Sequence, residues 1–171
     1  MPAENFYDQN NRYDLVLVIC GHNKGRSIIS EGFINDILER EQDRFPLTAG
    51  TYRAVSAGTR PGEGGINPQV VQVMSEYGID VSDPNVYFSK GVDSEPIKNL
   101  GGKIRKAIIV CDDECHFPPE LTHLGKPIPW KIPDPHGQDL ERVREIVGIA
   151  REKVYDFLGG LEIELRDAEG N

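Results

Sequence analysis

Short apolar runs alternate along the chain with segments in which apolar residues recur every three or four positions. The run from Leu15 to Cys20 is continuous, as expected for a strand that is buried on both faces. Further strands are predicted at residues 52–57, 104–111 and 127–132, and helices at residues 27–40, 67–77, 95–99 and 140–158. Gly159-Gly160 is expected to end the last helix.

This alternation predicts an α/β fold, with a doubly wound sheet of four parallel strands and helices on both faces. A chain of 171 residues is long enough for a single domain with its own core. No repeat, low-complexity tract or linker divides it. We expect residues 1–13 to form a mobile polar arm, residues 14–158 the folded core and residues 159–171 an acidic tail.

The net charge of −9 argues against nucleic acid or a membrane surface as partner, because both are polyanionic. The apolar runs are too short to span a bilayer, and the polar N-terminus lacks the pattern of a secretion signal, so a cytoplasmic location is expected. In that compartment the three cysteines, Cys20, Cys111 and Cys115, are interpreted as thiols and not as a disulfide framework.

The strongest chemical signal is the loop after the first strand. Cys20 ends the strand, Arg26 follows six positions later, and a helix begins at once. Backbone N–H groups and the dipole at a helix start attract an anion and favour the thiolate form of a nearby cysteine. A lone cysteine at a strand end is more often a core residue, but an arginine at this spacing favours a nucleophile beside a bidentate oxyanion ligand. Ser27 can either donate a hydrogen bond to the sulfur or cap the helix.

Two other residues with reactive side chains lie at or just after the ends of strands in the same predicted sheet. Cys111 ends the third strand, and Asp134 follows the fourth. Since parallel strands end at one edge, these residues are expected near Cys20. Asp134 can serve as a general acid, although an Asp-Pro pair is also a common turn starter. The sequence therefore predicts an enzyme that attacks a small tetrahedral oxyanion or a phosphomonoester.

The chain resembles the low-molecular-weight protein tyrosine phosphatases and the arsenate reductases that share their fold, from about residue 14 to residue 158. The resemblance implies that Cys20 is the nucleophile, that Arg26 binds and stabilises the oxyanion, that Ser27 supports the thiolate and that Asp134 is the general acid. It also implies that the loop residues Gly21, His22, Asn23, Lys24 and Gly25 bind the oxyanion with Arg26. The matching segments are Val16 to Ser27, Ser56-Ala57-Gly58-Thr59, Asn67-Pro68, Gly78-Ile79-Asp80-Val81-Ser82 and Asp134-Pro135.

Two loop positions depart from the family pattern. His22 stands where the family usually has glycine, and we expect it to tolerate a left-handed backbone. Gly25 stands where a second cysteine is common. A loop distorted at His22 would leave a non-catalytic anion-binding or redox-sensing module, which is one alternative to an enzyme.

Cys111 and Cys115 favour an arsenate reductase within this superfamily. The resemblance implies that Cys111 attacks the thiol–arsenate adduct on Cys20, that Cys115 resolves the disulfide, and that an external reductant such as thioredoxin restores the thiols. The family usually spaces this pair further apart, although a separation of four residues permits a disulfide within one helical turn. The alternative is a low-molecular-weight phosphatase that forms a cysteinyl-phosphate intermediate and has no need of Cys111. A zinc site at Cys111, Cys115 and His116 has no evident fourth ligand, so no metal site is predicted.

No resident cofactor is predicted. Some reductases of this family bind potassium beside the loop, and Asn23, Glu31 and Ser56 match the residues that hold it. The fourth, acidic position is occupied by Lys90, so a potassium site is not assigned.

Overall fold

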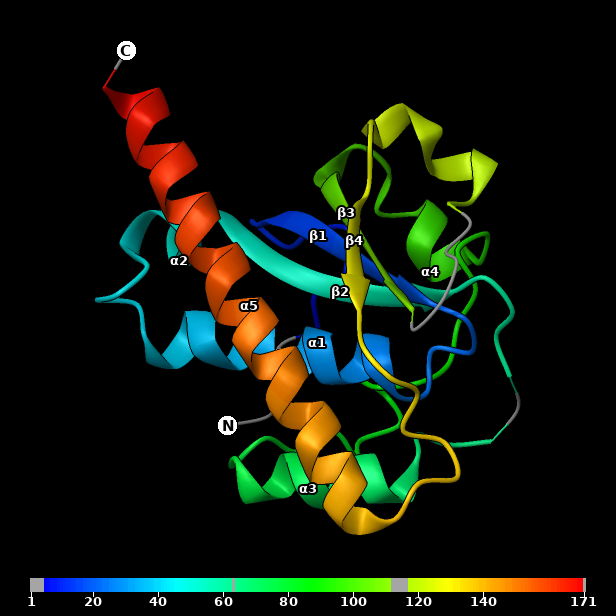
Figure 1. The fold of residues 1–171 in the computed structure, drawn as a ribbon. Coiled ribbons are helices and arrows are strands. Elements are labelled where there is room, and N and C mark those ends of the chain that lie inside the picture. The colour runs from blue at the N-terminus through cyan, green and yellow to red at the C-terminus, as the bar shows by residue number, and fades with distance from the viewer. Residues whose placement is uncertain (1–4, 63, 112–116, 171) are drawn as a thin grey trace.

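A computed structural model describes residues 5–62, 64–111 and 117–170 (Figure 1). Four parallel strands form one sheet in the order β2-β1-β3-β4. This architecture confirms the predicted α/β class and the predicted strands. The strands are β1 (Asp14–Cys20), β2 (Tyr52–Gly58), β3 (Ile104–Cys111) and β4 (Ile128–Lys131).

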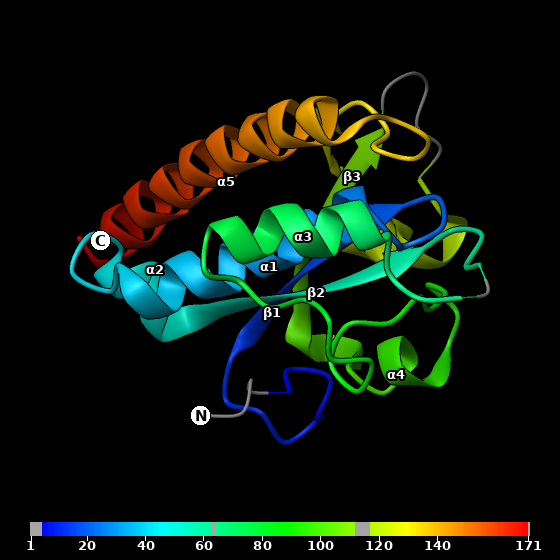
Figure 2. The ribbon, with the colours of Figure 1, turned by 90° about the horizontal axis from the view of Figure 1, so that it is seen from below.

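Helices cover both faces of the sheet, but unequally. The helices α1 (Arg26–Arg40), α3 (Pro68–Glu76) and α5 (Leu140–Glu169) lie on one face, and α4 (Glu95–Lys98) lies on the other (Figure 2). The short helix α2 (Pro46–Thr51) packs beside α5 on the first face. The sequence pattern did not predict α2. Two 3₁₀ turns, Gly101–Lys103 and Pro119–Leu124, complete the described elements.

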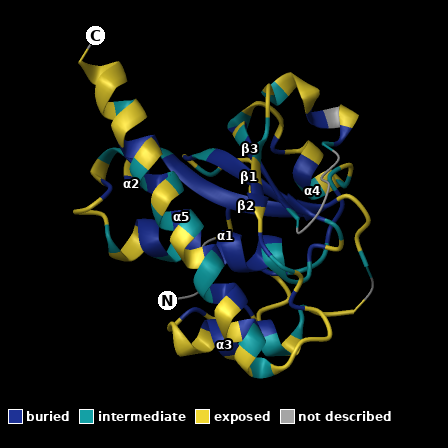
Figure 3. Ribbon diagram, viewed as in Figure 1, coloured by how far each residue is buried: buried dark blue, intermediate teal, exposed yellow. Residues whose placement is uncertain are grey.

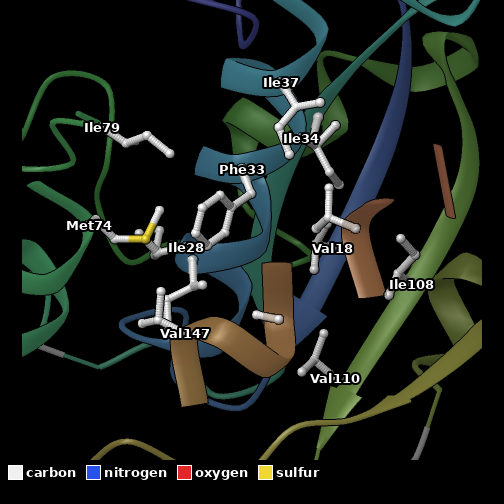
Figure 4. Packing of buried hydrophobic residues seen from close by; sticks show 14 of the residues in the cluster. Val18, Ile28, Phe33, Ile34, Ile37, Met74, Ile79, Ile108, Val110 and Val147 are labelled. Atoms are coloured by element: carbon white, nitrogen blue, oxygen red, sulfur yellow. The ribbon is translucent and has the colours of Figure 1, made fainter. Parts of the chain in front are cut away.

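The pleat of β1 divides the core into two clusters. Val16 and Val18 point toward α1, α3 and α5, whereas Leu17 and Ile19 point to the opposite face, and all four side chains are buried. Phe33 of α1 packs within the larger cluster (Figure 4). β1 and β2 are almost entirely buried (Figure 3), which explains why the first strand is a continuous apolar run.

The N-terminal arm contributes to the smaller cluster. Phe6 and Tyr13 are buried there, with their rings in edge-to-face contact at a centroid distance of 5.8 Å. Tyr7 lies between them in sequence and donates a hydrogen bond from its hydroxyl to Glu31 Oε2 at 2.9 Å. Residues 6–13 therefore cover the second face of the sheet and connect to α1.

The predicted end of the last helix at Gly159-Gly160 is wrong, because α5 continues to Glu169. The apolar stripe resumes beyond the glycines: Leu158 and Leu161 are both buried. Glu162 accepts hydrogen bonds from the backbone N–H groups of Leu47 and Thr48, which begin α2. Packing and these bonds outweigh the low helix propensity of two glycines.

The strand order places β1 at the point where the chain reverses its direction of winding. β2 lies on one side of β1, and β3 lies on the other. In open α/β sheets, ligands bind beyond the carboxyl ends of the strands at such a point. Cys20 ends β1 and Cys111 ends β3, so the fold puts both cysteines at this edge. None of the described helices is both long and apolar enough to cross a membrane.

Candidate active site

The loop from Gly21 to Gly25 connects β1 to α1 and is tied to the end of β2. The N–H groups of Thr59 and Arg60 donate to the carbonyl oxygens of Cys20 and Gly21 at 3.0 and 2.9 Å. A Cβ atom on Gly58 would lie 2.5 Å from the carbonyl oxygen of Gly21, which is too close for any side chain. The glycine in the Ser56-Ala57-Gly58-Thr59 segment therefore permits the contact that fixes the loop.

Cys20 is a free thiol that is buried with 6% exposure and still lines a pocket. Its Sγ atom lies 2.9 Å from Ser27 Oγ. The backbone N–H of Asn23 donates to the same sulfur at 3.2 Å. α1 has no acidic residue in its first turn, so the helix itself places no carboxylate beside an anion at its start. The hydrogen-bond donors and the helix dipole stabilise negative charge at this position, whereas burial by itself opposes it.

Arg26 and Asp134 approach one another across the pocket. Arg26 Nη2 and Asp134 Oδ2 are 4.0 Å apart, and the two side chains are 13% and 50% exposed. Arg26 Nη1 also donates to the carbonyl oxygen of Ile132 at 3.3 Å. Asp134 Oδ1 accepts from the N–H of His136 at 2.9 Å, so the carboxylate starts a turn and still reaches the pocket.

The pocket has a volume of ≈770 Å³ and joins the loop to two other segments. One segment follows β2, and the other connects β4 to α5. At the loop side, a Cβ atom on Gly25 would lie 2.9 Å from Pro135 Cγ, so the absence of a side chain lets the Asp134-Pro135 turn approach. The lining residues are Cys20, His22, Lys24, Gly25, Arg26, Gly62, Gly65, Asn67, Pro68, Gln69, Asp134, Pro135, His136 and Gly137.

The backbone strain expected at His22 falls instead on Asn23. Asn23 has φ of 57°, and it is the only non-glycine residue of the described chain with positive φ. Asparagine tolerates this conformation better than most residues. His22 is held from both sides: its Nδ1 lies 2.8 Å from the carbonyl oxygen of Arg60, and its carbonyl oxygen accepts from Ser89 Oγ at 2.5 Å. The loop thus accommodates the histidine.

A buried polar network lies behind the sulfur. Asn23 Nδ2 donates to Ser27 Oγ at 2.7 Å and to Ser56 Oγ at 2.8 Å. Ser56 Oγ donates in turn to Glu31 Oε1 at 2.6 Å. The ammonium of Lys90 donates to Asn23 Oδ1 at 2.9 Å. The three residues that match the potassium set therefore come together, and a positively charged side chain occupies the fourth position.

Burial perturbs the charged members of this network. Burial raises the pKa of Glu31, while the Lys90 charge and hydrogen bonds from Ser56 and Tyr7 oppose that change. Burial lowers the pKa of Lys90, and the charges of Glu31 and Cys20 oppose that change. Burial and the Glu31 charge raise the pKa of Tyr7 well above its ordinary value, so its hydroxyl stays protonated and able to donate.

Sequence reasoning assigned no part in the site to Tyr7, which closes the network from the N-terminal arm. An aromatic pair, Phe6-Tyr7, in an otherwise polar segment was the available signal. Ser89 donates a hydrogen bond to the His22 carbonyl oxygen, but no pattern in the sequence indicated this contact.

Cys111 is connected to the pocket through backbone contacts. Its carbonyl oxygen accepts from the N–H of Ile132 at 2.7 Å, and the carbonyl oxygen of Ile132 accepts from Arg26. Cys111 is disulfide-bonded, so the interpretation of the cysteines as thiols holds for Cys20 but is wrong for Cys111 in this structure. Cys115 and His116 lie outside the described residues, so the predicted resolving pair and the zinc alternative are not described by the structure. Among residues 5–62, 64–111 and 117–170, no three His, Cys, Asp or Glu side chains form a group that could hold a metal ion.

Comparison with known proteins identifies similar enzymes, although no family model matches the chain. Arsenate reductase from Staphylococcus aureus is 30% identical over 140 residues, which cover 80% of this chain and 92% of that protein. Glutaredoxin arsenate reductase from Synechocystis sp. is 28% identical over 144 residues, with coverage of 84% and 95%.

Solved structures show the same fold. An arsenate reductase in the phosphate binding state superposes with a TM-score of 0.64 and 26% identity, covering 86% of this chain and 98% of that chain. A low-molecular-weight protein tyrosine phosphatase from T. tengcongensis superposes with a TM-score of 0.60 and 21% identity, with coverage of 85% and 98%.

Proposed function

The chain belongs to the family of arsenate reductases that share the low-molecular-weight phosphatase fold, and from this premise we propose that it reduces arsenate to arsenite with Cys20 as the nucleophile. Membership makes it a cysteine-dependent enzyme and disfavours the non-catalytic alternative. The observation that carries the proposal is the buried free thiol of Cys20 at the head of the pocket, with Ser27 and the Asn23 N–H at the sulfur and Arg26 in the same wall.

In the first step the Cys20 thiolate attacks arsenic(V). An arsenic–sulfur bond forms, one arsenic–oxygen bond breaks, and the departing oxygen leaves as water after it takes up protons. Asp134, at the rim of the pocket and half exposed, is the proposed proton donor. Arg26 and the loop N–H groups neutralise charge on the remaining oxygens.

In the second step Cys111, once the disulfide that it forms in the structure has been reduced, attacks the Cys20 sulfur as a thiolate. A Cys20–Cys111 disulfide forms, the arsenic–sulfur electron pair passes to arsenic, and arsenite leaves as arsenic(III). Cys115 then attacks Cys111, which forms the Cys111–Cys115 disulfide and returns Cys20 to the thiolate. The ends of β1 and β3 on one edge of the sheet and the contacts from Cys111 through Ile132 to Arg26 support this assignment.

An external dithiol must reduce the final disulfide, because each arsenate consumes two electrons. The reductant proposed from the sequence is of the thioredoxin type. The Synechocystis relative is named a glutaredoxin arsenate reductase, so a glutaredoxin is the second candidate reductant for this chain. No resident metal or cofactor is needed for these steps.

Hydrolysis of phosphomonoesters is the second candidate function. A pocket of ≈770 Å³ is far larger than one tetrahedral oxyanion requires, and the phosphatase from T. tengcongensis shares the fold. The same thiolate would form a cysteinyl-phosphate, and water would hydrolyse it.

Two assays run side by side test the proposal. We expect arsenate-dependent oxidation of NADPH in the presence of thioredoxin or glutaredoxin and the matching reducing system, and little hydrolysis of an aryl phosphate. Cys20→Ser should abolish turnover with the fold intact, since a hydroxyl is not ionised near neutral pH. Normal turnover by this variant would rule out Cys20 as the nucleophile.

Disulfide mapping by mass spectrometry tests the relay itself. The protein is first fully reduced and the reductant removed, because Cys111 is disulfide-bonded in the structure. After reaction with arsenate, we expect a Cys111–Cys115 bond in the unmodified sequence and a trapped Cys20–Cys111 bond in Cys115→Ser. If arsenate leaves all three thiols free while aryl phosphates are hydrolysed, the phosphatase function replaces the reductase function.

A further inference from the structure

Lys90 is a buried lysine directly behind the oxyanion loop. Its side chain is only 4% exposed. Its ammonium donates to Asn23 Oδ1 at 2.9 Å and to the carbonyl oxygen of Phe88 at 2.7 Å. It also lies 4.7 and 4.5 Å from the ring centroids of Tyr7 and Phe88. A lysine is rarely buried so completely without a specific role for its charge.

Lys90 determines which way the Asn23 amide points. Both its ammonium and its backbone N–H donate to one atom of that amide, so the atom must be the oxygen. The nitrogen of the amide is then forced to face Ser27 Oγ and Ser56 Oγ. Each hydroxyl oxygen therefore accepts a hydrogen bond from Asn23 and keeps its own proton for another partner.

The two hydroxyl protons have one acceptor each. Ser56 donates to the carboxylate of Glu31 at 2.6 Å. Ser27 Oγ lies 2.9 Å from Cys20 Sγ, and with Asn23 as its donor the serine is left to donate to the sulfur. In the chain of hydrogen bonds from Lys90 through Asn23 and Ser27 to Cys20, each group donates to the next one, and the sulfur is the final acceptor. This direction suits a thiolate, which can only accept, and not a thiol.

The charge of Lys90 acts in the same sense as its hydrogen bonds. Burial lowers the pKa of Lys90, but the Cys20 and Glu31 charges both oppose that change. The interaction is mutual, so a positive Lys90 favours a negative Cys20. In a chain of net charge −9, this buried cation supplies positive charge on the side of Cys20 away from the substrate.

We propose that Lys90 is a positioning residue of the oxyanion loop, a built-in cation that orients Asn23, directs the Ser27 proton to Cys20 and maintains the thiolate that the proposed function needs. It does not touch the substrate, because its ammonium lies behind Asn23 and it does not line the pocket.

Other charged and titratable groups also face these two residues. Lys90 is faced by Glu31 from α1 and Tyr7 from the arm. Cys20 shares its pocket with Arg26, His22, Lys24, Asp134 and His136. None of them is altered by a substitution at Lys90, so the contribution of Lys90 can be measured against a constant background.

The test is the pH dependence of Cys20 alkylation by iodoacetamide, followed at the Cys20 peptide by mass spectrometry in the fully reduced protein. In the unmodified sequence we expect the midpoint well below pH about 8.5, the value of an ordinary thiol. Lys90→Met keeps the length of the side chain but removes the charge and the donors. It should raise the midpoint by about one pH unit or more, with kcat for arsenate falling in parallel.

Lys106→Met is the matched control. Lys106 lies on β3, and its ammonium is 3.3 Å from Glu164 Oε1, away from the pocket. This substitution removes the same charge from the chain, so it should leave the midpoint unchanged. If the alkylation midpoint rose equally in Lys90→Met and Lys106→Met, the rise would be due to the net charge of the protein, and the proposed role of Lys90 would be wrong.

Lys90→Gln separates the orientation of the Asn23 amide from the charge of Lys90. It also replaces Lys90→Met as the test variant if Lys90→Met does not fold. Its amide can still donate to Asn23 Oδ1, so we expect a smaller rise than in Lys90→Met. In a Ser27→Ala background the effect of Lys90→Gln should also shrink, because Lys90 acts partly through Ser27.

The outcomes separate this inference from the proposed function. A low midpoint in the unmodified sequence that does not move in folded Lys90→Met or Lys90→Gln overturns the inference and leaves the nucleophile intact. A midpoint near 8.5 already in the unmodified sequence also overturns the inference, because no stabilised thiolate would exist, whereas the proposed function depends on the turnover measured for Cys20→Ser.

Discussion

At the scale of single residues, Arg26 has a geometry that lysine cannot reproduce. One guanidinium nitrogen donates to the Ile132 carbonyl, and the other lies 4.0 Å from Asp134 across the pocket. A planar group with several donors can keep such a contact and still bind two oxygens of a substrate, whereas an ammonium is a single point of charge.

We therefore predict that Arg26→Lys lowers kcat/KM for arsenate by about 100-fold to 1,000-fold, the cost of losing an oxyanion donor. Steady-state kinetics with the coupled reductant assay measures this loss. Arg142→Lys, at the exposed start of α5, is the control and should keep the activity. Kinetics for Arg26→Lys close to those of the unmodified enzyme would make Arg26 a structural residue.

Asp134 is well suited to an isosteric test. Asparagine retains the oxygen that accepts from the His136 N–H, so the turn should survive the substitution. Asn cannot donate a carboxylic proton, and protonation matters only where the departing oxygen is basic. Using any aryl phosphate hydrolysis that the enzyme shows, Asp134→Asn should slow phenyl phosphate far more than 4-nitrophenyl phosphate. Equal losses for both esters would exclude a general-acid role.

The arrangement of the loop residues could be predicted because these residues are close together in the sequence. Cys20 and Arg26 are separated by five residues between a strand and a helix, a pattern that fixes their mutual position before the rest of the fold is known. The roles of Lys90 and Tyr7 were not predictable in this way. They reach the loop from distant segments, and the burial of a charge depends on what covers it.

At the scale of elements, the sequence pattern predicted long amphipathic helices and buried strands but not the ends that tertiary contacts decide. α2 has six residues, too few to show a period, and its backbone donors are satisfied by Glu162 of α5. The same carboxylate explains why α5 continues past Gly159-Gly160. A cap that comes from more than a hundred residues away leaves no local signature.

We predict that Glu162→Gln destabilises the protein by about 1–2 kcal/mol at pH 7. This is the range expected when hydrogen bonds to a charged carboxylate become hydrogen bonds to a neutral amide. Burial works to raise the pKa of Glu162, but hydrogen bonds from Thr48 and Leu47 outweigh it and lower the pKa. A lowered pKa in the folded state contributes stability above the ordinary value of 4.5, and this stability is lost as the pH falls through the folded value.

Urea unfolding at a series of pH values measures this contribution. The difference in the free energy of unfolding between the unmodified sequence and Glu162→Gln should be largest at pH 7 and become smaller below pH 4.5. Glu152→Gln, exposed on the same helix, is the control and should change little at either pH. A difference that is independent of pH would mean that the carboxylate charge does not stabilise the contact between α2 and α5.

At the scale of the whole molecule, the site joins segments from most of the chain. The loop is bonded to the end of β2, to the segment that carries Lys90 and, through Arg26, to the turn after β4. Unfolding any of these segments would dismantle the proposed anion site. An anion that binds the loop should thus stabilise the whole fold and not only a local region.

We predict that phosphate at 100 times its dissociation constant stabilises the fold by about 2.7 kcal/mol. For a domain of this size that corresponds to a rise in melting temperature of about 5–10 °C. Added salt alone also screens the repulsion within a chain of net charge −9, so the control is sodium chloride at equal ionic strength. Arg26→Ala should lose the difference between phosphate and chloride, because it removes the proposed bidentate ligand but barely alters the overall charge. If phosphate and chloride raise the melting temperature equally in the unmodified sequence, the stabilisation is screening, and the loop does not bind the oxyanion.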